Sequence, residues 1–198
     1  RLFQQLLKAK RSVQQVVFDA ESQHTQALVE KLDYEYHSFR LGHKISHYIL
    51  SGDIGMGKSQ VLQAFLERVN RREVIELAFQ LSYRRVPFYG AERLVELLSH
   101  LVKTPASKKQ EQYRGNDALY YFKALNRLFE VMQNEACRYV LVLQNLEAID
   151  RASMDIFIAC LFEHVPVSLF IVSEYCPNFE EDTKFLDKVM LLPRVRLL

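Results

Sequence analysis

The order of glycine, lysine and serine between residues 52 and 59 suggests phosphate-binding chemistry. Gly52 and Gly57 are separated by four residues, and Lys58 and Ser59 follow directly. Gly52, Gly55 and Gly57 allow the loop to adopt backbone angles that side chains disfavour and to turn its N–H groups around an anion. A lysine here reaches the outer phosphates of a nucleotide, and a serine hydroxyl suits Mg²⁺. The residues predicted to contact a nucleotide are Gly52, Asp53, Ile54, Gly55, Met56, Gly57, Lys58, Ser59 and Gln60.

The segments on either side of this loop are those that such a site requires. Apolar residues 48–50 precede it and predict the end of a strand. Apolar residues after it recur at helical spacing, so the positive N-terminal end of a helix would point at the same anion. These recurring residues are Val61, Leu62, Phe65, Leu66 and Val69. The alternative interpretation is a glycine-rich strand-to-helix turn that binds nothing.

A second polar group follows the strongly apolar run 139–143. Nucleotide hydrolases place a carboxylate for Mg²⁺, and an acid that acts on the attacking water, after such a strand. Gln144 and Asn145 occupy these positions, so Gln144 can reach the ion only through a water, and Asn145 cannot act as a general base. Glu147 and Asp150 are the candidates for a substitute catalytic carboxylate. For Asp150 the favoured interpretation is a cap on the helix that follows.

Composition restricts the class of protein. The chain has 198 residues, 49% of them hydrophobic, which suffices for one α/β core. Its net charge of +2 gives no support for nucleic-acid binding by bulk electrostatics. The three cysteines share no metal-ligand spacing and favour a reducing compartment, so we expect a cytoplasmic protein. No apolar run approaches about 18 residues, so no membrane span is predicted.

Strand and helix patterns alternate along the chain. Apolar runs predict strands over 47–51, 74–81, 139–143, 167–172 and 189–192, and helical spacing predicts helices from 57 to 70 and over 91–102, 117–135 and 153–163. Such alternation implies right-handed crossovers and a mainly parallel sheet of about five strands. We expect residues 1–40 to form an N-terminal linker or helical segment, and residues 41–198 to form the α/β domain of a longer multidomain protein.

Three smaller segments complete the interpretation. Residues 1–31 suit a linker or a helix from a preceding domain, and the alternative for residues 13–18 is a short strand. His37, His43 and His47 lie close together in sequence, and we interpret them as part of a solvated helix or loop rather than as metal ligands. The polar stretch 104–116 predicts a surface loop.

Four segments together resemble a known family. They are GDIGMGKSQVL at 52–62, VPFYGAERLVELL at 86–98, YVLVLQNLEAIDRASMDIF at 139–157 and VPVSLFIVSEYCP at 165–177. Their order is similar to that in the AAA-like signal-transduction (STAND) P-loop module that follows the cyclase domains of soluble (type 10) adenylyl cyclases. The resemblance implies a three-layer P-loop NTPase sandwich. It also implies binding of ATP with Mg²⁺ and a regulatory role beside other domains of the same chain.

The same resemblance assigns roles to single residues. Ser173 falls near the sensor position at the end of the fourth strand, and Ser59 would hold Mg²⁺ through the nucleotide. Gln144 and Asn145 stand where the family has Asp and Glu. This departure implies that Mg²⁺ is weakly anchored and that hydrolysis is impaired or absent.

Three functional hypotheses follow from these observations. The favoured one is an ATP-binding regulatory module of a cyclase-like protein in cAMP signalling, because an intact phosphate loop accompanies an amide pair. An alternative is an active ATPase switch that uses Glu147 or Asp150 as its carboxylate. The third is a structural or interaction domain with a vestigial nucleotide site. Whether the domain is an enzyme stays open at this point.

Overall fold

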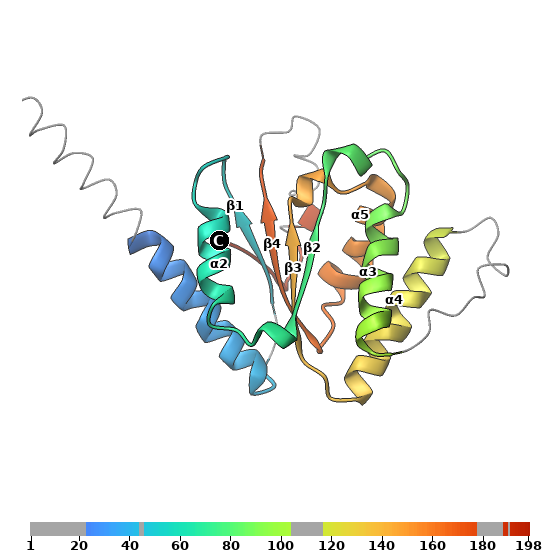
Figure 1. Ribbon diagram of the computed structural model, residues 1–198, viewed down its shortest axis with the longest axis horizontal. Coiled ribbons are helices and arrows are strands. Elements are labelled where there is room, and N and C mark those ends of the chain that lie inside the picture. The colour runs from blue at the N-terminus through green and yellow to red at the C-terminus, as the bar shows by residue number, and fades with distance from the viewer. Residues whose placement is uncertain (1–22, 44–45, 104–116, 178–187, 190) are drawn as a thin grey trace, which may run out of the picture.

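The computed structural model describes residues 23–43, 46–103, 117–177, 188–189 and 191–198 (Figure 1). The strands are β1 His47–Ser51, β2 Val74–Ala78, β3 Tyr139–Gln144, β4 Leu169–Tyr175 and β5 Val195–Leu197. The helices are α2 Lys58–Leu66, α3 Tyr89–Leu101, α4 Asp117–Asn134 and α5 Arg151–Phe157, and residues 23–40 are also helical. Short 3-10 helices span Arg71–Glu73, Leu81–Tyr83 and Leu146–Ala148. Strands and helices therefore alternate as the sequence predicts.

The strands described form one parallel sheet in the order β2-β3-β4-β1-β5. β1 lies between β4 and β5, and β4 separates β1 from β3. Parallel strands end at one edge of the sheet, and ligands of such folds bind outside the carboxyl ends of the strands. The loop after β1 and the residues that end β3 and β4 therefore share one edge.

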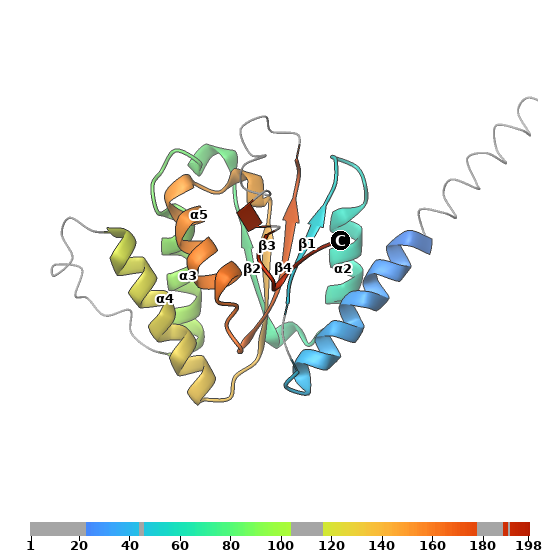
Figure 2. The ribbon, with the colours of Figure 1, turned by 180° about the vertical axis from the view of Figure 1, so that it is seen from behind.

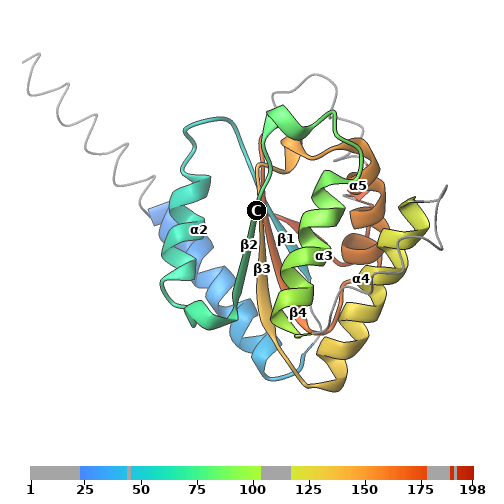
Figure 3. The same cartoon turned by 45° about the vertical axis from the view of Figure 1, so that its right-hand side comes forward.

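Helices cover both faces of the sheet and give the molecule three layers (Figures 1 and 3). The helix of residues 23–40 and α2 lie on one face, which we call the α2 face. Helices α3, α4 and α5 lie on the opposite face, the α3 face, and the view from behind shows the same division (Figure 2). The predicted fold class, an α/β P-loop sandwich around a parallel sheet, is confirmed.

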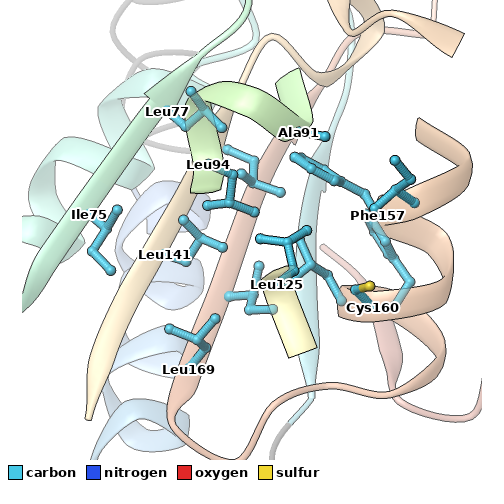
Figure 4. Packing of buried hydrophobic residues seen from close by; sticks show 14 of the residues in the cluster. Ile75, Leu77, Ala91, Leu94, Leu125, Leu141, Phe157, Cys160 and Leu169 are labelled. Atoms are coloured by element: carbon cyan, nitrogen blue, oxygen red, sulfur yellow. The ribbon is translucent and has the colours of Figure 1, made fainter. Parts of the chain in front are cut away.

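Alternation along the strands decides which layer each side chain enters, because successive residues of a strand point to opposite faces. In β1, Leu50 packs with the α2-face core, whereas Ile49 packs with the α3-face core. In β4, Phe170 and Val172 pack on the α2 face, and Ile171 packs on the other. Figure 4 shows the α3-face core, with labels on Ile75, Leu77, Ala91, Leu94, Leu125, Leu141, Phe157, Cys160 and Leu169.

The fourth strand is longer than the sequence pattern predicts. We expected it over 167–172, but it spans Leu169–Tyr175, and all of its residues are buried. This extension adds Ser173 and Glu174 to the sheet. Both residues lie close to the carboxyl edge of the sheet, which is the edge where the candidate site lies.

The fifth strand is not where local apolar content placed it. The prediction of a strand over 189–192 is wrong, because the strand is Val195–Leu197. His47 of β1 pairs with Val195, and the His47 N–H donates to the Arg194 carbonyl at 2.7 Å. Pairing with β1 therefore fixes this strand.

Three further elements keep their place but change their ends. β2 stops at Ala78, before its predicted end. α3 begins at Tyr89, two residues before its predicted start at 91. The helix expected over 153–163 is α5 followed by a π-helical turn, Ile158–Glu163. These are end effects that leave the order of elements unchanged.

The helix of residues 23–40 packs directly on the α2 face. Val29, Leu32, Tyr36 and Phe39 are its buried apolar residues. The Tyr36 hydroxyl donates to Glu73 Oε2 at 2.9 Å, which ties the helix to the turn before β2. The expected helix is thus confirmed, while the domain division at residue 40 stays a prediction.

Some predictions lie outside the described residues. These are the interpretations of residues 1–22 and of the surface loop 104–116. Of the helices that the structure describes, none combines the length and the apolarity needed to cross a bilayer.

Candidate functional site

The loop between β1 and α2 takes backbone angles that favour glycine at two positions. Gly55 and Gly57 have φ angles of 87° and 79°, in the left-handed region. Gly52 does not, contrary to expectation, but a Cβ on Gly52 would lie 3.1 Å from the Met56 sulfur. The spacing of the glycines therefore reflects two different constraints, backbone conformation at two positions and crowding at the third.

The Lys58 side chain bends back over this loop. Its ammonium group donates to the carbonyls of Gly52 at 2.5 Å and Asp53 at 2.8 Å. These bonds join Lys58, at the end of the loop, to the residues that begin it. A bound phosphate would receive the same ammonium group, which has three donors to share.

The first turn of α2 borders the loop and carries no acidic side chain of its own. Gly57 is the N-cap and offers no side chain. The first intrahelical bond described runs from the Val61 N–H to the Gly57 carbonyl at 3.0 Å. The N–H groups of the residues before Val61 therefore have no acceptor within the helix. These N–H groups and the helix dipole together attract a phosphate.

A cavity of about 400 Å³ opens beside the loop, between α2 and the helix of residues 23–40. Both polar and apolar side chains line it, which suits a nucleoside next to a phosphate site. The lining residues are His24, Thr25, Leu28, Leu50, Ser51, Gly55, Met56, Gly57, Lys58, Gln60, Val61 and Leu198. The tip of the loop projects outward, with Ile54 84% and Met56 70% exposed. Of the predicted nucleotide contacts, Gly55, Met56, Gly57, Lys58 and Gln60 line this cavity, whereas Gly52, Asp53, Ile54 and Ser59 do not.

Gln144, the last residue of β3, and Asn145, which follows it, both hydrogen-bond with the backbone of Phe79. Asn145 has a φ angle of 55°, a conformation that Asn tolerates better than most residues, and its Nδ2 donates to the Phe79 carbonyl at 3.3 Å. Gln144 is half-buried at the end of the strand, where its backbone carbonyl accepts from the Phe79 N–H at 3.0 Å. Neither residue offers a carboxylate at this edge.

Asp150 is the N-cap of α5, as its favoured interpretation predicts. Its Oδ1 accepts from the N–H groups of Ser153 and Phe88, each at 2.8 Å, and its Oδ2 accepts from Gly90 at 3.0 Å. The carboxylate is buried and joins the starts of α3 and α5. Because three backbone donors engage both of its oxygens, Asp150 does not fit the alternative role of a catalytic carboxylate.

Glu147 also contacts the backbone. Its Oε2 accepts from the N–H of Cys176, the residue directly after β4, at 3.1 Å. This bond joins the segment after β3 to the segment after β4. Its catalytic role stays a prediction.

Ser173 lies on the α3 face and does not point toward the loop. Its Oγ is 2.7 Å from Nε2 of His47, whose ring stacks on Phe162 with centroids 4.1 Å apart. Burial lowers the pKa of His47 to about 3, so the ring is neutral. The interpretation of His47 as a solvated residue is therefore wrong, and the sensor role of Ser173 stays a prediction without a contact to the loop.

Glu174 is the residue that sequence reasoning missed. It follows Ser173 in β4, is only 6% exposed, and points to the α2 face by alternation with Phe170 and Val172. Burial raises the pKa of its carboxyl, hydrogen bonding with Ser59 and the charge of Lys58 lower it, and Glu147 raises it. The signal in the sequence was an acid within an otherwise apolar run, hidden because the strand was expected to end at 172.

The residues present fit a nucleotide with Mg²⁺. The loop N–H groups and Lys58 would hold the phosphates, and the Ser59 hydroxyl is placed at the first turn of α2 for the ion. One oxygen of the buried Glu174 carboxylate, Oε1, has no hydrogen-bond partner among the residues that the structure describes. Within those residues there is no group of three or more His, Cys, Asp or Glu side chains placed to hold a metal ion alone, so any ion here would need phosphate oxygens as further ligands.

Comparison with known proteins agrees with this geometry. The family model of the AAA ATPase domain matches residues 25–172 of the chain. The chain belongs to the AAA ATPase domain family. The match spans the phosphate loop, the end of β3 and most of β4, and it supports a nucleotide-binding P-loop module. A comparison with curated proteins found no match for this chain. The finer resemblance to the adenylyl cyclase module therefore has no support from these comparisons.

Two segments of this AAA ATPase domain carry polar residues at the carboxyl edge of the sheet. The loop after β1 has its full sequence and an open cavity beside it. The end of β3 presents two amides, and the nearby acids Glu147 and Asp150 bond to backbone N–H groups.

Proposed function

We propose that this AAA ATPase domain is an ATP-binding regulatory module with impaired or absent hydrolysis. The observation that carries the proposal is the contrast between the open phosphate loop and the end of β3. Phosphoryl transfer to water requires a group that orients or deprotonates the water. Asn145 is not a base, and both oxygens of Asp150 accept backbone hydrogen bonds.

In this proposal the chain's own residues position the nucleotide without breaking it. The N–H groups of the loop and Lys58 bind the phosphates, and the cavity beside the 23–40 helix takes the nucleoside. Mg²⁺, when bound, neutralises phosphate charge. Because His24, Thr25 and Leu28 line this cavity, the nucleotide would contact the loop and the helix at once.

The finer form of the proposal assigns the module to a protein similar to soluble adenylyl cyclase, in cAMP signalling. The support for it is the order of the four segments between 52 and 177 that resemble the module of that family. The partners would be other domains of the same chain, which respond to nucleotide occupancy, and a cytoplasmic location follows from the cysteine usage. Measuring cyclase activity of the full-length protein with and without Lys58→Ala tests this assignment.

A binding measurement tests the core of the proposal. ATP at about 100 times its dissociation constant should stabilise the fold by ~2.7 kcal/mol. Thermal unfolding with and without ATP, together with an assay for phosphate release, measures both halves. We expect stabilisation without steady release of phosphate. Absence of any stabilisation by ATP would favour a structural domain with a vestigial site instead.

An active ATPase switch is the second candidate, and one observation favours it. Glu147 and Glu174 lie close enough for their charges to interact, near Lys58 and Ser59. Steady phosphate release that Lys58→Ala abolishes would establish this function. The same result would contradict impaired hydrolysis but not nucleotide binding.

A further inference from the structure

The register of the sheet places an acid next to the position where the β3 acid is missing. Leu143 of β3 pairs with Ser173 of β4, so Gln144 and Glu174 are the next residues along these neighbouring strands. Leu50 of β1 pairs with Glu174. Leu50, Glu174 and Gln144 therefore form a row across the α2 face. β4 lies between the other two strands, so Glu174 is one strand spacing, about 4.8 Å, closer to the loop strand than Gln144 is.

The surroundings of Glu174 are costly for a carboxylate unless a cation joins it. The side chain is 6% exposed, and its Oε1 has no hydrogen-bond partner within the described part of the chain. A buried charge without a full set of partners destabilises a fold. Lys58 is close enough to influence Glu174 electrostatically, but its ammonium group donates to loop carbonyls. The arrangement keeps a carboxylate oxygen uncommitted beside the phosphate loop.

We propose that Glu174 anchors the Mg²⁺ ion that accompanies ATP, in place of an acid at the end of β3. The proposal rests on the proposed function, because the ion would also need phosphate oxygens. Ser59 contributes its hydroxyl oxygen, and Glu174, which hydrogen-bonds with Ser59, contributes negative charge and an acceptor beside it. Mg²⁺ sites in nucleotide-binding proteins commonly combine one or two carboxylates with substrate phosphates, which matches this set.

Glu147 has a different task in this arrangement. Its Oε2 is bonded to the Cys176 N–H, directly after the end of β4. It therefore fixes the backbone that follows Glu174 and adds negative charge nearby, while Glu174 faces Ser59. Glu147 is the matched control for Glu174, since both are acids of equal size at the same edge.

The test measures ATP affinity by calorimetry with the 198-residue chain, in EDTA and in excess Mg²⁺. For the unaltered chain we expect Mg²⁺ to tighten ATP binding. Glu174→Gln should remove this Mg²⁺ effect, with a loss of about tenfold or more in Mg²⁺ and unchanged affinity in EDTA. Glu147→Gln should keep most of the Mg²⁺ effect. Gln144→Glu, added to Glu174→Gln, should restore part of it, because it returns an acid to the same row.

Thermal unfolding without nucleotide separates anchoring from a structural role. Because Glu174 is a buried acid with an unpartnered oxygen, Glu174→Gln should leave the melting temperature unchanged or raise it. A lower melting temperature together with equal losses of ATP affinity in EDTA and in Mg²⁺ would overturn the proposal in favour of a structural residue. A retained Mg²⁺ effect in Glu174→Gln with loss of phosphate release would overturn it in favour of a general base.

The outcomes also separate this proposal from the proposed function. ATP binding that does not respond to Mg²⁺ in the unaltered chain would overturn the role of Glu174 alone, and would match the weak anchoring that Gln144 implies. Failure to bind ATP in either buffer would overturn both. Loss of the Mg²⁺ effect in Glu174→Gln with its return in the double variant supports both.

Discussion

The segments that follow β1 and β3 end at the same edge of the sheet but handle their polar groups in opposite ways. After β1, the N–H groups of the first turn of α2 have no acceptor within the helix, and the N-cap, a glycine, has no side chain to bond to them. After β3, Asp150 accepts three backbone N–H groups, and Glu147 and Asn145 each bond to backbone. The first segment keeps donors for a ligand, whereas the second uses its polar side chains to hold the fold.

The difference shows that an acid near a phosphate loop is not by itself a catalytic group. Both oxygens of Asp150 accept backbone N–H groups, and Oε2 of Glu147 accepts the N–H of Cys176. Glu174 belongs to no recognised sequence motif, yet its carboxylate hydrogen-bonds with Ser59 of the phosphate loop. Whether an oxygen is already engaged therefore matters more than its distance from a motif.

The largest expected effect comes from the segment that holds the fold. Asp150→Ala should destabilise the domain by about 4 kcal/mol, because it leaves three backbone donors without a charged acceptor. Denaturant unfolding measures this loss. Asp150→Asn keeps a capping oxygen and should lose about half as much. A loss below about 1 kcal/mol for Asp150→Ala would end the assignment of this segment to structure.

The opposite pattern is expected for the segment that keeps its donors. Lys58→Ala should change the unfolding free energy without nucleotide by about 1 kcal/mol or less, because the side chain is partly exposed. It should abolish most of the ~2.7 kcal/mol that saturating ATP adds. Lys31→Ala, an exposed lysine of the 23–40 helix, is the control and should keep the ATP effect. Equal ATP stabilisation in both variants would show that the loop does not hold the nucleotide.

A pH titration extends the comparison to the far face of β4, where a buried polar group serves the core. The pKa of His47 is about 3 in the folded chain, against about 6.5 when unfolded. Between these values the unfolded chain binds more protons, so stability is full above pH 6.5 and falls as the pH is lowered toward 3. The slope should be about 1.4 kcal/mol per pH unit.

His47→Gln isolates this contribution, because glutamine stays neutral and can still bond to Ser173. Unfolding free energies at pH 7 and pH 5.5 for both proteins give the difference in slope. Parallel pH profiles of the two proteins would mean that His47 is not kept neutral by burial.

The smallest effect concerns the backbone that ends β3. Asn145→Gly should be neutral or stabilising by a few tenths of a kcal/mol, because glycine adopts a φ of 55° without strain. Asn145→Ala should destabilise by about 1 kcal/mol. Neither should alter ATP affinity. A change of ATP affinity in Asn145→Ala would bring this residue into the nucleotide site and weaken the division between the two segments.

The sequence predicts well what depends on local pattern. The phosphate loop follows from residue spacing, and the parallel sheet follows from alternating strand and helix signals. The cap by Asp150 is also local, since it precedes its helix by one residue. Its bonds to Phe88 and Gly90 are not local, because they join segments 60 residues apart or more.

What the sequence does not predict depends on pairing between distant strands. β5 forms at Val195–Leu197 because that stretch pairs with β1, whereas Val189, Leu191 and Leu192, the described apolar residues before it, are in none of the strand pairs. The role of Glu174 depends on the length of β4 and on its register with β1. If the strand ended at 172, as predicted, Glu174 would lie in a loop, where an acidic residue is common and indicates no function.

Aromatic packing on the α2 face has a mechanical consequence. Phe170 of β4 contacts Tyr36 and Phe39 of the 23–40 helix and Phe65 of α2, with ring centroids 5.8 Å apart in each case. α2 is the helix whose first turn borders the loop. Because Phe170 contacts rings of both helices, a displacement of the 23–40 helix would also displace α2. A displacement of α2 would in turn shift the 23–40 helix.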